Sequence, residues 1–267
     1  MLTSLNVSIL LIIFFITVIV SVLSGIMFLN SRIPLAYVRI HIFLVALPPL
    51  VAFIGLIGAP KNIEVGFWYS DFLAWLMAFF VLVIGLIIQR YCVQYLMGDR
   101  SYRKYFTLFT ITTSFAAMAW LTGDLRIMVV SWGITLLGLT LLISLTSAWK
   151  VTRAAAKVTG KLFLLSWIAL LLAVVWMTLL TGEWRYTSIF TASNLAQINA
   201  WESFGINMLI ILAVMVPAAQ FPFQRWLIES VAAPTPVSAI MHAGIVNAGG
   251  VILARFSPIF NGDIATF

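Results

Sequence analysis

The chain has 267 residues, of which 63% are hydrophobic and 9% are charged, and its mean hydropathy is +1.12. One soluble core cannot bury that much apolar surface, so the composition excludes a soluble domain and favours a protein of the bilayer. The net charge of +7 needs no nucleic acid, because basic loops facing anionic headgroups account for it.

Apolar runs long enough to cross a bilayer recur along the whole chain. A hydrocarbon layer ~30 Å thick needs about 20 apolar residues per helix. We therefore predict an all-α polytopic membrane protein with about eight transmembrane helices, at residues 5–29, 40–58, 72–88, 105–122, 127–148, 162–180, 204–221 and 237–256. The runs lack the in-out alternation of a transmembrane barrel.

The first run follows no basic n-region, and no small-residue cleavage site follows it. We interpret it as a membrane anchor and not as a signal peptide. Cys92 is the only cysteine, so it excludes an intramolecular disulfide, and with two histidines the chain offers no usual zinc site. His41, beside Arg39 at the start of the second run, is predicted to be interfacial.

Basic residues alternate between the two sides of the predicted membrane. The connections after the first, third, fifth and seventh runs hold 11 of the 15 basic residues: Arg32, Arg39, Arg90, Arg100, Arg103, Lys104, Lys150, Arg153, Lys157, Lys161 and Arg225. The other side holds Lys61, Arg126, Arg185 and Arg255. The positive-inside rule then predicts cytoplasmic loops at 90–104 and 150–161, with both termini outside a bacterial cytoplasmic membrane.

The connection 181–203 carries aromatic residues along its length. Trp184, Tyr186 and Trp201 are typical of the aromatic belt at headgroup depth. We predict that this connection lies along the outer interface.

Pro217 and Pro222 bracket Gln220 in the seventh run. Each proline removes a backbone donor and frees the carbonyl four residues earlier, so the helix must bend or break there. Two interpretations stay open: a hydrated gap on an ion path, or a packing kink.

His242 lies in the eighth run, and Ser238 precedes it by one helical turn, on the same face. An ionisable side chain within a membrane is costly and is a functional candidate by default. Histidine titrates near neutral pH, so we predict a proton relay at His242 that Ser238 orients. The alternative is a neutral histidine satisfied by its neighbours.

Two further features of this region favour packing roles. Small residues and one amide form a stripe at helical spacing, namely Ala239, Ala243, Asn247 and Gly250, which allows another helix to approach closely. Arg225 and Glu229 are four residues apart and are expected to form a surface pair, worth at most about 1 kcal/mol.

The motifs QFPFQRW (220–226) and APTPVSAIMHAGIVNAGGVILARFSPIF (233–260) resemble the proton-translocating membrane subunits shared by respiratory complex I and Mrp-type antiporters. Within that superfamily, HAGIVNAGG looks most like the DabB-type subunit of the DabA/DabB inorganic-carbon system. The stretch QRYCVQYLMGDRSYR (89–103) is also similar to the sequence entering the fourth helix of these proteins.

The resemblance implies an antiporter-like fold, built in full from two inverted repeats of five helices. It assigns residues 1–104 to helices 1–3 and residues 105–267 to the first repeat, helices 4–8, with a broken seventh helix. A second repeat is missing from this sequence. A fragment, a split gene product and a truncated relic all stay open.

Two positions depart from the pumping subunits. Those subunits carry a glutamate directly after a tryptophan in the fifth helix and a lysine three residues before the glutamine of the seventh. Here Gly133 follows Trp132, and Pro217 precedes Gln220. The charge pair is absent, which argues against an autonomous complex-I-like pump and fits the DabB-type branch better.

The resemblance implies a transporter subunit and not an enzyme, without a cofactor or metal of its own. It would couple proton or cation flux to inorganic carbon uptake by a zinc-containing DabA-type partner. His242, Ser238, Gln220, Pro217 and Pro222 are the candidate proton path. The alternatives are an antiporter-like membrane-arm subunit of an NADH:quinone oxidoreductase or Mrp complex, and a truncated subunit that conducts no ions.

Overall fold

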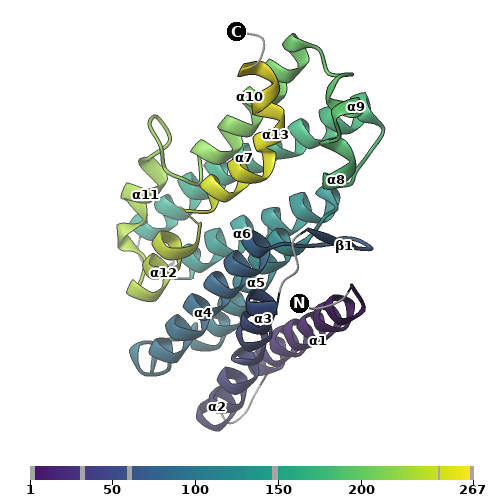
Figure 1. Ribbon diagram of the computed structural model, residues 1–267. Helices are drawn as coiled ribbons and strands as arrows, with labels where there is room; N and C mark the ends of the chain where they lie inside the picture. The colour runs from purple at the N-terminus through teal and green to yellow at the C-terminus, as the bar shows by residue number, and fades with distance from the viewer. Residues whose placement is uncertain (1–3, 31–33, 59–61, 146–149, 246, 265–267) are drawn as a thin grey trace.

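The structure is a computed structural model that describes residues 4–30, 34–58, 62–145, 150–245 and 247–264. It is a bundle of long helices with one short hairpin at one end (Figure 1). This confirms the predicted polytopic helical architecture.

The N-terminal helices are α1 (Ser4–Leu29), α2 (Pro34–Val45), α3 (Leu47–Gly58), α4 (Phe72–Tyr95) and α5 (Tyr102–Leu121). α2 and α3 together form the second predicted segment, which begins at Pro34 and not at residue 40. They meet at Ala46, where Pro48 and Pro49 cannot donate backbone hydrogen bonds to the preceding turn.

A hairpin that the sequence analysis did not predict joins α3 to α4. β1 (Ile63–Val65) pairs antiparallel with β2 (Trp68–Ser70) across a two-residue turn. Gly66 has a φ of +61°, as the first central position of such a turn requires. The Phe67 carbonyl accepts the Gly123 N–H at 2.8 Å, so the hairpin is fixed to the end of α5. We call this end of the bundle the hairpin end.

The next helices are α6 (Leu125–Ser144), α7 (Lys150–Thr181), α8 (Tyr186–Ile189), α9 (Ala192–Leu195) and α10 (Ala200–Met215). The predicted loop at 150–161 is wrong, because these residues form the first three turns of α7. Ala155 and Thr159 are buried against the bundle while Lys157 and Lys161 face outward, so the segment is amphipathic and folds as a helix. The predicted loop at 90–104 is likewise helical at both ends.

The C-terminal part contains α11 (Arg225–Glu229), a 3₁₀ turn η1 (Ser230–Ala232), α12 (Thr235–Ile240), a π-helix η2 (Met241–Ile245) and α13 (Ala248–Ile264). The predicted eighth span is therefore two helices joined through a π-helical turn. Figure 1 shows α13 beside α10 and α12 beside α4, and these pairs of helices pack together.

Five helical segments in the described part of the chain are long and apolar enough to cross a membrane: 6–29, 36–58, 72–95, 125–144 and 150–181. α10 and residues 248–260 are shorter apolar helices. α5 is less apolar because it carries Thr107, Thr110 and Thr113, yet it lies buried between α1, α4 and α6. A helix shielded from lipid can hold polar side chains that find partners inside the protein.

Candidate functional site

The seventh apolar segment is broken where its prolines predict. α10 ends at Met215, and Ala219 then has a φ of +52°. Because Pro217 has no N–H, the Ala213 carbonyl loses its helical donor. The Ser166 hydroxyl on α7 donates to that carbonyl at 2.6 Å in a buried contact. A protein side chain therefore satisfies this carbonyl, as helix breaks at membrane depth require.

Trp226 fills the inner side of the break. Its side chain is fully buried, and its Nε1 donates to the Val216 carbonyl at 2.7 Å. Its ring packs edge-on against Phe163 of α7, with 4.8 Å between the ring centroids. Gln220 and Pro222 lie on the exposed side. The break is thus packed within this chain, and Gln220 faces its surface.

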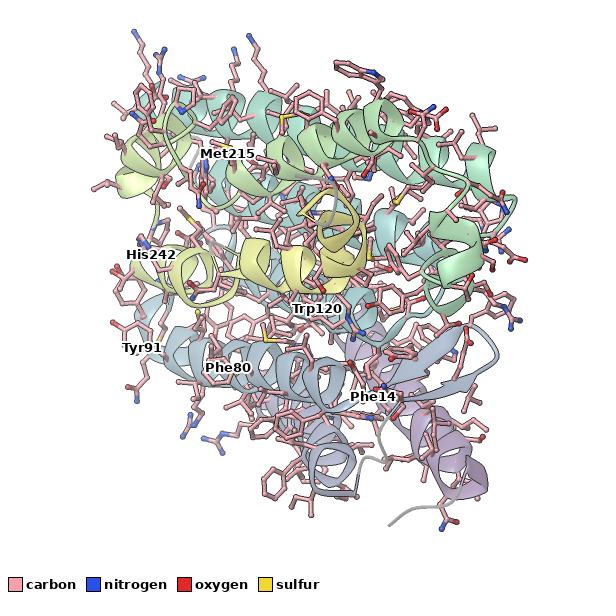
Figure 2. All side chains as sticks on the ribbon, turned by 45° about the horizontal axis from the view of Figure 1, so that its top comes forward. Phe14, Phe80, Tyr91, Trp120, Met215 and His242 are labelled. Atoms are coloured by element: carbon pink, nitrogen blue, oxygen red, sulfur yellow. The ribbon has the colours of Figure 1, made fainter. Side chains whose placement is uncertain are left out.

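His242 lies in the π-helix η2, and its side chain is exposed. Figure 2 places it near the edge of the molecule, whereas Trp120 lies toward the centre. Ser238 is one turn earlier on α12, but no hydrogen bond joins these two described side chains. Asn247 Nδ2 donates to the His242 carbonyl at 3.2 Å, which satisfies a backbone group next to the π-helical turn. The imidazole is therefore free to contact a neighbouring protein or lipid.

The other C-terminal candidates lie on the surface. Arg225 and Glu229 form an exposed ion pair, with 2.6 Å between Nε and Oε1. Ala239, Asn247 and Gly250 are exposed, so the small-residue stripe faces away from the described helices. The described part of the chain thus provides no helix that packs on this stripe. The side chain of Ala243 lies outside the described residues.

Gly133, the position that carries a glutamate in the pumping subunits, has no room for a side chain. A Cβ atom there would overlap the indole of Trp167, whose Cδ1 would be 2.8 Å away. The Trp167 Nε1 donates to the Val129 carbonyl at 2.9 Å, which fixes the indole in place. The space beside Gly133 is therefore filled by the half-buried indole of Trp167.

Trp132, beside Gly133, lines a small cavity behind the π-helix. The cavity has a volume of about 20 Å³, and Trp120, Gly244 and Ala248 also line it. The Trp132 Nε1 is buried and has no hydrogen-bond partner among the described residues. A cavity of this size is large enough for a single water molecule.

His41 is the main correction, because it is not interfacial. Its side chain is completely buried between α1, α4 and α5. Its Nδ1 lies 2.7 Å from Ser24 Oγ, and its Nε2 lies 3.1 Å from Gln89 Oε1 and 3.2 Å from Thr110 Oγ1. The ring also stacks on Phe28, with 6.0 Å between centroids. A polar cluster thus joins four helices at membrane depth, through partners far apart in the sequence.

A second built site, at the hairpin end, joins α4 to α13. The Arg255 guanidinium donates to both carboxylate oxygens of Asp71, at 2.9 and 3.2 Å, and to the Trp120 carbonyl at 3.1 Å. It also lies over the rings of Tyr69 and Tyr186. Arg255 was predicted only as an outer basic residue. Its place inside an apolar run was a signal for an intramembrane partner.

Asp124 caps α6 at the same end. Its carboxylate accepts from the backbone N–H of Arg126 at 2.9 Å and pairs with the Arg126 guanidinium at 2.6 Å. Burial acts to raise the pKa of this carboxyl, but the hydrogen bonds and charge of Arg126 outweigh it and hold the pKa below its ordinary value. Trp184 lies under the Arg126 guanidinium, and exposed Trp201 is free for the predicted interfacial role.

No group of three or more histidine, cysteine or acidic side chains that could hold a metal occurs in the described part of the chain. The structure also describes no disulfide there, and Cys92 is a free, buried thiol.

The family model described as "NADH:quinone oxidoreductase/Mrp antiporter, TM" matches residues 122–267. A second, described as "NADH-Ubiquinone oxidoreductase (complex I), chain 5 N-terminus", matches residues 58–106. The chain belongs to the NADH:quinone oxidoreductase/Mrp antiporter family. The antiporter-like fold expected from the resemblance is thereby confirmed.

Two relatives share more than half of their aligned residues with this chain. The chain is 60% identical over 265 residues to the probable inorganic carbon transporter subunit DabB of Bacillus anthracis, covering 99% of this chain and 52% of that one. It is 59% identical to the protein of the same description from Bacillus subtilis (strain 168), covering 100% and 53%. The chain thus spans about half the length of these curated relatives.

A solved structure agrees with the fold. The Mrp complex from Dietzia sp. DQ12-45-1b superimposes with a TM-score of 0.78 at 25% identity, over 91% of this chain and 28% of that chain. The broken seventh segment and the π-helical eighth segment therefore belong to an antiporter-like membrane subunit.

Proposed function

We propose that this chain is the membrane subunit of an energy-coupled inorganic carbon (CO₂ or bicarbonate) uptake system. It would couple a proton or cation gradient to a DabA-type, zinc-containing partner in a bacterial cytoplasmic membrane, with both termini outside. The observation that carries the proposal is the 60% identity to a DabB subunit over 99% of this chain. Gly133 and Pro217, which lack the pumping charge pair, support the same branch.

Within this function we propose His242 as the proton relay, with Ser238 one turn away. The exposed imidazole lies on a π-helical turn, and such turns are frequent at functional sites. It is free of protein partners among the described side chains, so it can exchange protons with a neighbouring subunit or a hydrated surface. Gln220, exposed between Pro217 and Pro222, is the second polar group on the proposed path.

The proposal is tested first by purification of the tagged, detergent-solubilised protein from its native membrane. Recovery of a large zinc-containing DabA-like protein supports it. Recovery of flavin and iron–sulfur subunits would instead support the second candidate, a membrane-arm subunit of an NADH:quinone oxidoreductase. Recovery of other antiporter-like subunits without them would support an Mrp-type complex, which the similarity to the Mrp structure favours. Recovery of neither would favour a non-conducting subunit.

Growth in air then tests the relay. His242→Ala and His242→Gln should both abolish growth without added CO₂, because neither side chain titrates near neutral pH. The matched control Ile228→Ala, at a residue 65% exposed in the same part of the chain, should grow normally. Membrane immunoblots must show equal amounts of each protein. Normal growth of both His242 variants would exclude the relay and leave the subunit assignment intact.

A further inference from the structure

A long groove runs between α2 and α4 on the surface of the bundle. Its volume is about 1000 Å³, and its walls are apolar, with Ile42 and Phe43 on one side and Leu86 and Ile87 on the other. Phe43 is 67% exposed and Ile87 is 62% exposed. The two walls belong to the candidate membrane segments 36–58 and 72–95, so we place the groove against the bilayer.

Two unpaired arginines lie in this groove. Arg39 of α2 and Arg90 of α4 line it, and both side chains are exposed. Within the described part of the chain, neither guanidinium forms a hydrogen bond or an ion pair. Both residues fall inside candidate membrane segments, where a charge without a partner is costly. An anionic group bound in the groove would pair with both charges.

Both arginines lie near one end of their candidate membrane segments. At ~1.5 Å per residue, Arg39 is about 5 Å from the start of its apolar segment, and Arg90 is about 8 Å from the end of α4. Both lie within snorkelling distance of the headgroup layer. On the other side, the groove extends from Leu86 past the end of α4 to Met97, and Arg90 lies about 6 Å from Leu86 by the same rise.

The groove continues into a second hollow of about 640 Å³, since Met97 lines both. Arg100, Arg103 and Lys104 line this hollow and add three basic side chains. Asp99 also lines it, but its carboxylate accepts the Ser101 backbone N–H at 2.6 Å. The balance of charge where the two hollows meet is therefore positive.

We infer that the α2–α4 groove binds one anionic phospholipid, with its phosphate between Arg39 and Arg90 and an acyl chain along the apolar walls. The two arginines match its phosphate, and the apolar side chains beside them match its acyl chain. The buried His41–Gln89 contact joins α2 to α4 beside the groove. The lipid would therefore cover a helix–helix contact that the protein already holds together. The inference is independent of the proposed transport function.

Native mass spectrometry of the purified protein with added lipid tests this directly. We expect wild type to bind phosphatidylglycerol at one high-affinity site and phosphatidylcholine far more weakly. Each arginine near a membrane surface is worth about 1 kcal/mol. The double variant Arg39→Gln with Arg90→Gln should therefore bind phosphatidylglycerol roughly 25-fold more weakly.

Two control variants make the outcome decisive. Lys157→Gln with Lys161→Gln removes the same charge from the exposed face of α7 and should leave the affinity within about threefold of wild type. Arg39→Lys with Arg90→Lys keeps the charge and should retain most of the binding. The inference would be overturned if Arg39→Gln with Arg90→Gln bound phosphatidylglycerol as tightly as wild type does. It would also be overturned if wild type bound phosphatidylglycerol and phosphatidylcholine equally well. Circular dichroism confirms that each variant keeps its helices.

Discussion

His41 gives the sharpest test of the structure, because its buried cluster can be dismantled one partner at a time. In His41→Leu the apolar side chain fills a similar volume, but it cannot hydrogen-bond to Ser24, Gln89 or Thr110. Gln89 Nε2 already has no partner, and Gln89 Oε1 would keep only the Thr110 hydroxyl, at 3.2 Å. An unsatisfied buried polar group costs about 1–3 kcal/mol.

The magnitude follows from the hydrogen bonds that the substitution removes. Hydrogen bonds between membrane helices average about 0.6 kcal/mol, and the two shortest hydrogen bonds of His41 contribute about 1 kcal/mol on that scale. With part of the cost of an under-satisfied Gln89 added, we expect His41→Leu to lower the free energy of unfolding by about 1–3 kcal/mol. Equilibrium unfolding in mixed detergent–SDS micelles measures this difference. Ile40→Ala, at a neighbouring residue 56% exposed, is the matched control and should change stability little.

A second variant separates the effect of missing hydrogen bonds from that of poor packing. Replacing both partners of a buried hydrogen bond by apolar groups is nearly neutral, whereas removing one leaves the other unsatisfied. The double variant His41→Leu with Gln89→Leu should therefore be more stable than His41→Leu alone. If His41→Leu is as stable as Ile40→Ala, or if the second leucine destabilises further, the polar cluster does not hold these helices together.

Three other predictions use the same unfolding assay. Gly133→Glu should fail to fold stably, whereas Gly133→Glu with Trp167→Ala should recover a folded protein, because the indole occupies the space that the new side chain needs. Ser166→Ala should cost about 1–3 kcal/mol by leaving a carbonyl unpaired, while Ser166→Thr, which keeps the hydroxyl, should cost less. The pKa of Asp124 is lowered beside Arg126, so its ionised form stabilises the fold. The free energy of unfolding of wild type should exceed that of Asp124→Asn by its full amount above about pH 4–5. This difference should fall as the pH drops through the folded-state pKa. A pH-independent difference would exclude this charge effect.

The sequence predicted the membrane segments well because hydropathy is a local property. Each predicted apolar run coincides for most of its length with one or two helices, and Pro217 marks the end of α10 within two residues. The run 204–221 extends past α10, and residues 146–148 of the run 127–148 lie outside the described residues. The error at 150–161 has a physical origin. The charges of Lys157 and Lys161 suggested a loop, but buried residues such as Ala155 and Thr159 alternate with them at helical spacing, so the stretch is an amphipathic helix.

The burial of His41 could not be predicted from the sequence. This histidine was predicted at the interface and is fully buried. Burial depends on partners from other helices, and the partners of His41 lie 17, 48 and 69 residues away. No local pattern contains that information. Asp71 and Arg255 are 184 residues apart and were missed for the same reason.

The two departures from the pumping subunits share one structural cause on α7. Pro217 frees the Ala213 carbonyl, which Ser166 satisfies, and Gly133 leaves the space that Trp167 fills. Ser166 and Trp167 are adjacent, so one turn of α7 completes both uncharged positions. Placing a carboxylate at position 133 requires Trp167 to move, because a Cβ atom there would lie 2.8 Å from the indole Cδ1. A single substitution at Gly133 therefore cannot restore the charge pair, whose other position holds Pro217.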